Sequence, residues 1–257
     1  MSDHGRMHSR APDAAGCPAS GDAPATQHLH PRVTSFRTRR STLSGGQQTT
    51  WERRWPELGM YARDAEGPAP LLDTVAWFGR RAPVVLEIGC GGGTSTLAMA
   101  QGEPHIDVVA VEVYRRGLAQ LLSAVDREGV TNIRLIRGDG VDVLEHVFGP
   151  DSLTGVRIFF PDPWPKTRHH KRRLLQPSTV ALIADRLVPG GVLHAATDHI
   201  GYAEQIAEVG DAEPRLRRIT EEAGALPICV KRPVTKYEGK AHHAGTAVAE
   251  LLWEKLR

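Results

Sequence analysis

The sequence of 257 residues has few cysteines and no long apolar run. Its cysteines, Cys17, Cys90 and Cys229, are odd in number and far apart, which argues against a disulfide framework or a zinc site. No run of about eighteen apolar residues could form a membrane-spanning helix. The N-terminus has no apolar segment typical of a secretory signal. We therefore expect a cytoplasmic protein with no membrane segment and no metal.

The first 34 residues almost lack large apolar side chains and are rich in Ala, Pro, Gly, Ser and His. Such a segment cannot bury enough surface to offset chain entropy, so residues 1–34 are predicted to be a disordered tail. Residues 35–70 form a basic arm that contains five arginines within "SFRTRRSTLSGGQQTTWERRWPELG". Trp51 and Trp55 share one helical face there. The arm could either pack on the core as an amphipathic segment or contact a polyanion with its basic residues, and the sequence leaves both alternatives open.

From residue 71 onward, short apolar runs alternate with segments of helical spacing. Strands are predicted over residues 83–89, 107–112, 132–139, 156–162 and 191–198. Between them, Leu118 to Val125 and Val180 to Leu187 carry apolar residues at helical spacing, and Pro189-Gly190-Gly191 predicts a stop before the last of these strands. Strict alternation predicts an α/β fold over residues 71–257, with a doubly wound, mostly parallel, Rossmann-like sheet and helices on both faces.

Acidic residues lie at or just after the ends of the predicted strands. They are Glu87, Glu112, Asp139, Asp162 and Asp198. In open parallel sheets, ligands bind beyond the carboxyl ends of the strands. A single acid there could cap a helix, but five in register predict a binding site.

The Gly-rich turn "LEIGCGGGT" follows the first of these strands. Gly89 and Gly91 would let a ligand approach the main chain closely. Thr94 replaces the third glycine of the dinucleotide-binding pattern, and Glu87 would repel a pyrophosphate, so an NAD-dependent oxidoreductase is the least expected class. S-adenosylmethionine, which carries a sulfonium and an ammonium and no phosphate, suits this turn better.

The two following acids fit the same ligand. Glu112 lies at the second strand end, where it can accept hydrogen bonds from ribose hydroxyls. Asp139 can likewise accept from the adenine amino group. The turn and the spaced acids together predict a methyl-donor site.

The segment "PDPWPKTRHHKRR" follows the fourth predicted strand. Its prolines could hold Asp162 toward an acceptor while Trp164 shapes a base-sized slot; alternatively, they form a rigid turn with Trp164 packed inward. The basic residues behind them could be a solvated helix face. A dense, acid-free cluster next to the site favours contact with the phosphates of an RNA.

The chain resembles the bacterial tRNA (guanine-N7)-methyltransferase family over roughly residues 35–257. The resemblance is carried by "FRTRR", "WPELG", "LEIGCGGG", "PDPWPKTRHHKRR", "ATDH" and "RPVTKYE". It implies a class I methyltransferase that moves a methyl group from S-adenosylmethionine to guanine N7 in the variable loop of tRNA. Monomer and homodimer are both left open.

By matching positions, the resemblance also implies roles for individual residues. Donor binding falls to Glu87, Glu112, Asp139 and Asp162, and Asp162 is in addition catalytic. Substrate contact falls to Lys166, Asp198, Thr235, Lys236, Tyr237 and Glu238. RNA contact falls to Arg168, His169, His170, Lys171, Arg172 and Arg173.

The C-terminus departs from the family pattern. Where relatives continue T-K-F-E with a residue and Arg-Gly, and later carry Gly-His before Asp-Leu, this chain has Lys240-Ala241, Gly245-Thr246 and Glu250-Leu251. We expect this region to supply the last strands of the sheet, one of them antiparallel. A methyltransferase for a small molecule or a protein and a non-catalytic RNA-binding protein are the alternative functions.

Overall fold

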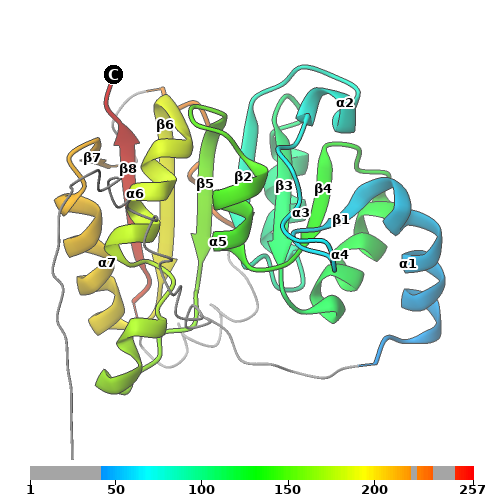
Figure 1. Cartoon of the computed structure of the whole chain (residues 1–257), viewed down its shortest axis with the longest axis horizontal. Helices are drawn as coiled ribbons and strands as arrows, with labels where there is room; N and C mark the ends of the chain where they lie inside the picture. The colour runs from blue at the N-terminus through cyan, green and yellow to red at the C-terminus, as the bar shows by residue number, and fades with distance from the viewer. Residues whose placement is uncertain (1–41, 221–224, 234–246) are drawn as a thin grey trace, which may run out of the picture. The chain divides into compact units, whose positions relative to one another are not determined.

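A computed structural model describes residues 42–220, 225–233 and 247–257. Eight strands form one sheet in the order β1-β4-β3-β2-β5-β6-β8-β7 (Figure 1). Their bounds are β1 (Gly59–Tyr61), β2 (Val84–Ile88), β3 (Asp107–Glu112), β4 (Ile133–Arg137), β5 (Leu153–Phe159), β6 (Leu187–Thr197), β7 (Leu216–Ile219) and β8 (Ala249–Lys255). All strand pairs are parallel except the two that β8 makes with β6 and β7. The predicted sheet with an antiparallel C-terminal strand is confirmed.

Helices cover both faces of this sheet. They are α1 (Gly45–Leu58), α2 (Thr74–Phe78), α3 (Thr94–Gly102), α4 (Arg115–Glu128), α5 (Gly140–Asp142), α6 (Pro177–Arg186) and α7 (Ile200–Ala212), with a π-helical turn η1 (Val143–Val147) and a 3-10 helix η2 (Thr167–Arg172). Among the described residues, none of these helices is long and apolar enough to span a bilayer.

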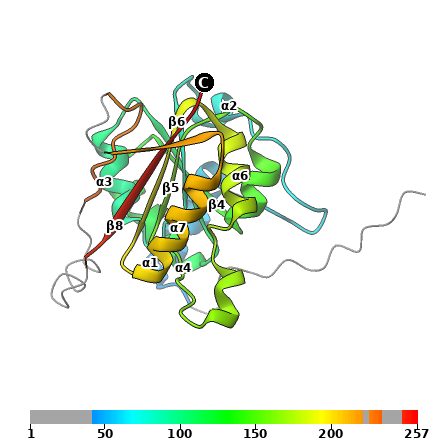
Figure 2. The same ribbon diagram turned by 90° about the vertical axis from the view of Figure 1, so that its left-hand side faces the viewer.

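The central strands β2 to β4 are rich in valine and isoleucine and are almost wholly buried, as strands covered on both faces must be. Their alternate side chains enter two cores. One core joins them to α6, α7 and η1, and the other joins them to α1 and α4. Figure 2 views the sheet near its edge, with α3 on one side of the strands and α6 on the other.

The basic arm becomes part of the fold from residue 45. Helix α1 begins with a capping box at Ser44, and Trp51 and Trp55 stack with ring centroids 4.0 Å apart. Both rings are buried in the core shared with α4. Strand β1 then pairs with β4. The core-packing alternative therefore holds for the two tryptophans, while the boundary at residue 70 stays a prediction.

The predicted stop at Pro189-Gly190-Gly191 was misplaced. Helix α6 already ends at Arg186, and β6 begins at Leu187. The pairing with β5 jumps from Leu187 to Val192, so residues 188–191 form an irregularity inside the strand, where Gly190 has φ 82°. The disordered-tail prediction for residues 1–34 lies outside the described residues.

Candidate active site

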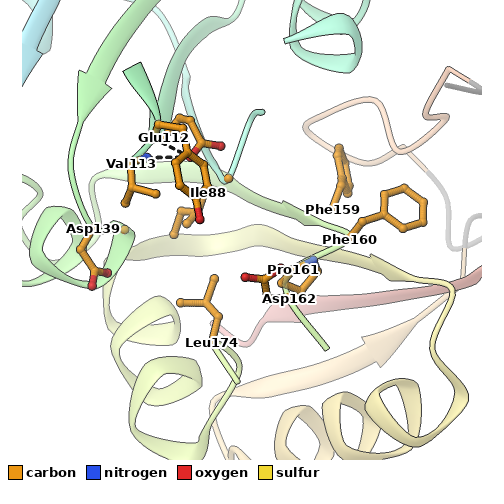
Figure 3. Close-up of a pocket in the computed structure, with 12 residues that line it drawn as sticks. Ile88, Glu112, Val113, Asp139, Phe159, Phe160, Pro161, Asp162 and Leu174 are labelled. Atoms are coloured by element: carbon orange, nitrogen blue, oxygen red, sulfur yellow. Dashed lines mark hydrogen bonds between the residues drawn. The ribbon is translucent and has the colours of Figure 1, made fainter. Parts of the chain in front are cut away.

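A cleft opens where the central strands end. It encloses about 660 Å³, part of it open to solvent. It is lined by Ile88, Gly89, Glu112, Val113, Tyr114, Asp139, Gly140, Phe159, Phe160, Pro161, Asp162 and Leu174. Figure 3 shows Glu112, Asp139 and Asp162 spaced around this opening. Three of the predicted acids are therefore brought to one cleft.

Glu112, the last residue of β3, is fixed by main-chain donors. Its Oε1 accepts from the N–H groups of Val113 and Tyr114 at 2.7 and 3.0 Å, and its Oε2 accepts from Gly91 N at 2.9 Å. A carboxylate offers about four acceptor positions, so about one remains for a ligand hydroxyl. Burial raises the pKa of Glu112, the three backbone N–H groups lower it, and the negative charge of Asp162 raises it further.

The Gly-rich turn is held by a glycine that the sequence analysis missed. A Cβ on Gly117 in α4 would lie 2.3 Å from Gly91 O, so only glycine lets the helix approach the turn this closely. Gly89 and Gly91 have φ values of 82° and 55°, in the left-handed region that favours glycine. The available signal was Gly117 itself, since a glycine within a helical pattern usually has a packing reason.

Asp139 and Glu87 are placed differently. Asp139 lines the cleft and caps α5, accepting from Val141 N at 3.0 Å. Glu87 is only 3% exposed and does not line the cleft. Its Oε1 accepts from the Thr96 hydroxyl at 2.9 Å, and its Oε2 has no partner among the described residues. Glu87 is thus buried next to the Gly-rich turn and is not part of the described cleft surface.

The turn after β5 presents Asp162 between two unusual backbone conformations. Phe160 and Trp164 have φ values of 50° and 44°, which bulky residues rarely adopt. Each such residue costs on the order of 1–3 kcal/mol and persists only when its surroundings fix it. Asp162 itself is exposed and lines the cleft. The strained backbone at Phe160 and Trp164 therefore fixes the position of the Asp162 carboxylate.

Trp164 is packed inward, as one of the two alternatives had it. Its side chain is 4% exposed and does not line the cleft. Arg172 lies 4.9 Å above its ring, and His169 meets it edge-on with centroids 5.8 Å apart. Trp164 therefore supports the basic helix η2, and the aromatic residues that line the cleft are Tyr114, Phe159 and Phe160.

The wall formed by Phe159 and Phe160 is supported from behind. The Arg232 guanidinium lies 5.5 and 4.9 Å from their ring centroids. Arg232 donates to Glu250 at 2.8 Å, and the other Glu250 oxygen is 2.6 Å from Nε2 of the buried His194. Glu250, one of the departures from the family pattern, thus has a structural role in this chain.

The predicted RNA contacts, and Lys166 as a predicted substrate contact, differ in their exposure. Lys166, Arg168 and Lys171 are exposed on or beside η2, while His169, His170 and Arg172 are half-buried. Arg173, which ends the basic block, is only 3% exposed. It donates to Pro163 O at 2.8 Å, to Gly201 O at 3.0 Å and to Gln205 Oε1 at 2.7 Å.

Arg173 is thus held inside the fold, and its contact with RNA stays a prediction that this burial does not favour. Its guanidinium also covers the Tyr202 ring at 4.8 Å, so it ties the acceptor turn to α7. These bonds occupy three of the five N–H donors of the guanidinium and hold Arg173 away from the exposed basic residues of η2. Sequence alone could not separate it from its exposed neighbours, because its partners in α7, Gly201 and Gln205, are 28 and 32 residues further along the chain.

The remaining predicted contacts are less constrained. Asp198 follows β6 and is exposed, and it is not among the residues that line the cleft. Residues 235–238, the predicted Thr-Lys-Tyr-Glu substrate block, lie outside the described residues. No local pattern in the sequence marks Tyr114, Gly140 or Leu174 as residues of the cleft.

The charge of the cleft indicates the kind of ligand it fits. Among the described residues, its lining includes three carboxylates and no lysine or arginine. Such a site would repel a pyrophosphate and attract a cation. The glycines beside it allow a ligand to reach the main chain. These residues fit S-adenosylmethionine, and together with the sheet they define a class I methyltransferase.

Comparisons with known proteins agree with this class. A family model described as "Putative methyltransferase" matches residues 81–251. Among solved structures, the aminoglycoside resistance methyltransferase NpmB1 shares the fold with a TM-score of 0.50 and 14% identity, over 76% of this chain and 98% of that one.

Curated relatives are far more similar. A protein of Mycolicibacterium gilvum named tRNA (guanine-N(7)-)-methyltransferase is 71% identical over 99% of both chains. A protein of the same name from Mycolicibacterium vanbaalenii is 73% identical over 99% of both chains. Another from Mycobacterium avium is 64% identical over 98% of this chain and 99% of the relative. The chain belongs to the tRNA (guanine-N7)-methyltransferase family.

Proposed function

We propose that this protein transfers the methyl group of S-adenosylmethionine to N7 of a guanine in the variable loop of tRNA. The proposal is supported most directly by one juxtaposition. A cleft whose described lining holds three carboxylates and no lysine or arginine lies at the end of β5, and the exposed basic helix η2 begins five residues after Asp162. A cationic donor and a polyanionic acceptor have opposite electrostatic needs, and these two neighbouring surfaces meet them.

The donor would be held by the strand ends. When bound, S-adenosylmethionine supplies an electrophilic methyl group on a sulfonium. Glu112 has an acceptor position left for a ribose hydroxyl, and Asp139 can accept from the adenine amino group. Gly89 and Gly91 leave room at the main chain, while Glu87 adds negative charge from below.

Asp162 would act on the acceptor side of the cleft. Guanine N7 has a free lone pair at neutral pH, so attack needs no prior removal of a proton, and the protein contributes position and electrostatics. A carboxylate beside the purine stabilises the positive charge that arrives there. It can also accept from guanine N1–H and the exocyclic amine, which adenine cannot match at N1. Both roles require the rigid presentation of Asp162.

The tRNA would lie over η2. Lys166, Arg168, Lys171 and Arg172 would neutralise phosphates, which gives affinity independent of sequence. Asp198 and the block Thr235, Lys236, Tyr237 and Glu238 remain proposed substrate contacts. A cytoplasmic location and a monomeric or homodimeric state remain proposals as well.

The direct test is nucleoside mass spectrometry after incubation of purified protein with unmodified tRNA and a donor that carries a trideuterated methyl group. The expected product is 7-methylguanosine with the added mass of three deuterons, and the Asp162→Ala variant should give almost none. Label in a different nucleoside would contradict N7 of guanine as the acceptor. Label that appears only with protein or metabolite fractions would favour the alternative substrate classes.

A further inference from the structure

A buried arginine in β5 lies directly beside the donor site. Arg157 has no exposed surface. In the register of the sheet, its Cα is paired with that of Glu87 on β2, and paired residues of parallel strands direct their side chains to the same face. A buried charge is costly unless it is compensated. Its partners therefore indicate what it does.

Those partners form a closed cycle. Arg157 Nη2 donates to Glu103 Oε2 at 2.6 Å and to the carbonyl of Cys229 at 3.0 Å. Glu103 Oε1 in turn accepts from Cys229 N at 2.6 Å. The neighbours Ile228 and Val230 are buried in the core on this face. The cycle thus fastens a cover over Arg157 that keeps water out and strengthens its electrostatic interactions.

Three polar atoms in this layer have no partner among the described residues. They are Nε and Nη1 of Arg157 and Oε2 of Glu87. The bonds of Arg157 to Glu103 and Cys229 therefore leave other guanidinium N–H donors unused. The positive charge of Arg157 also acts on a second carboxyl group, that of Glu87. One cation is shared between two buried carboxylates, and one of these belongs to the predicted donor site.

The charge on Glu87 does not serve stability. Burial raises the pKa of Glu87, while the positive charge of Arg157 and the Thr96 hydroxyl lower it. A carboxyl whose pKa is raised by folding contributes stability at low pH that is lost as the pH rises through that pKa. A charge kept against this trend near a cleft is typical of a ligand-binding group.

The other titratable groups near Glu87 would oppose its ionisation or are neutral. Glu103 follows α3 and accepts from the guanidinium of Arg157, and Glu112 ends β3, the strand that pairs with β2. The Cys90 thiol lies in the Gly-rich turn, and its pKa is raised well above the usual value by burial, then by Glu112 and Glu87. Among the described groups that act on Glu87, Arg157 is the cation.

We propose that Arg157 is a positioning residue for the donor site, which keeps the Glu87 carboxylate charged for a cationic ligand and fastens the Cys229 segment above it. Arg157 touches neither donor nor tRNA and acts through Glu87. The inference rests on the proposed function in one respect, that the ligand is the cation S-adenosylmethionine.

The test compares two variants, Glu103→Gln and Arg157→Met combined with Glu103→Gln. Both lack the ion pair between residues 103 and 157, and only the second lacks the guanidinium. Carbon-13 NMR of the Glu87 carboxyl in the donor-free protein, assigned with Glu87→Gln, should give a titration midpoint at least about one unit higher in the double variant. Equal midpoints would overturn the proposal.

Donor binding provides an independent readout. Calorimetric titration with S-adenosylmethionine between about pH 8 and pH 6 should show the double variant losing affinity relative to Glu103→Gln as the pH falls, by about tenfold for each unit of difference in the midpoints. A ratio independent of pH would contradict the role of Arg157. Wild-type protein that binds no donor would refute the proposed function, while the NMR comparison would still decide the effect of Arg157 on Glu87.

A conservative variant covers the case in which the double variant does not fold. Arg157→Lys keeps the positive charge and loses the planar donor geometry. With folding checked by circular dichroism, it should retain the wild-type midpoint of Glu87. A midpoint raised by about one unit in a folded Arg157→Lys protein would show that the charge at this position is not what controls Glu87.

Discussion

The donor half and the acceptor half of the cleft are built on different principles. In the donor half, Glu112 and Asp139 sit at strand ends and are held by the N–H groups of the residues that follow them. In the acceptor half, Asp162 lies between two residues with left-handed backbone conformations. That turn is held by Arg173, which donates to Pro163 O in the turn and to Gly201 and Gln205 in α7.

This difference shows where each half derives its precision. The donor half uses local hydrogen bonds that follow from the fold itself, so its geometry survives changes elsewhere. The acceptor half stores strain, and strain persists only where distant packing fixes it. Substitutions at a distance should therefore damage the acceptor half more than the donor half.

The largest effect is expected at Asp162, where the two halves meet. Asp162→Ala should lower the rate of tRNA methylation about a thousandfold, because it removes the charge placed beside the purine. Donor binding should remain detectable, since Glu112 and Asp139 are untouched. Single-turnover methylation and calorimetric donor titration separate the two effects. Glu204→Ala, an exposed carboxylate on α7, is the matched control; equal rates in the two variants would remove Asp162 from the reaction.

Arg173 should be the structural weak point of the acceptor half. Arg173→Met loses its hydrogen bonds to Pro163, Gly201 and Gln205, and the free energy of unfolding should fall by about 3 kcal/mol. Urea unfolding measures this loss. Arg172→Met, the adjacent half-buried arginine, should change stability by well under half as much. The reverse order would mean that the turn is not held by Arg173.

Gly117 tests the donor half in the same way. Gly117→Ala should raise helix propensity in α4 by about 1 kcal/mol, yet its Cβ would force the Gly91 carbonyl away from 2.3 Å. Donor affinity should fall about tenfold while tRNA binding stays unchanged. Gly102→Ala in α3, where no atom lies within 4 Å of the new Cβ, is the control. Unchanged donor affinity in Gly117→Ala would show that the turn can move freely.

The smallest effect is expected on the exposed part of the basic block. Replacing Arg168 and Lys171 with Gln should raise KM for tRNA several-fold and leave stability unchanged. The slope of log affinity against log salt should fall by about one for each contact removed. Filter binding over a range of salt concentrations measures this slope. An unchanged slope would mean that η2 faces away from the RNA.

The sequence predicted what depends on local pattern. The five strands and the spacing of Leu118 to Val125 follow from periodicity, and the acids at the strand ends follow from that sheet. It missed what depends on tertiary distance. Neither the left-handed backbone at Phe160 nor the burial of Arg173 has a local signature, and Arg157 was unremarkable until the register placed it beside Glu87. The donor half of the cleft depends mainly on such local pattern, whereas the acceptor half depends mainly on contacts between distant parts of the chain.

The central claim is that the two halves meet at guanine N7. It is tested most directly with tRNA that carries 7-deazaguanine at the acceptor position, which replaces the attacking nitrogen with carbon and preserves the N1–H and amine groups. Such tRNA should bind as tightly as the unmodified form and accept no labelled methyl group from the wild-type protein. Methyl transfer to the deaza tRNA at the normal rate would contradict the account.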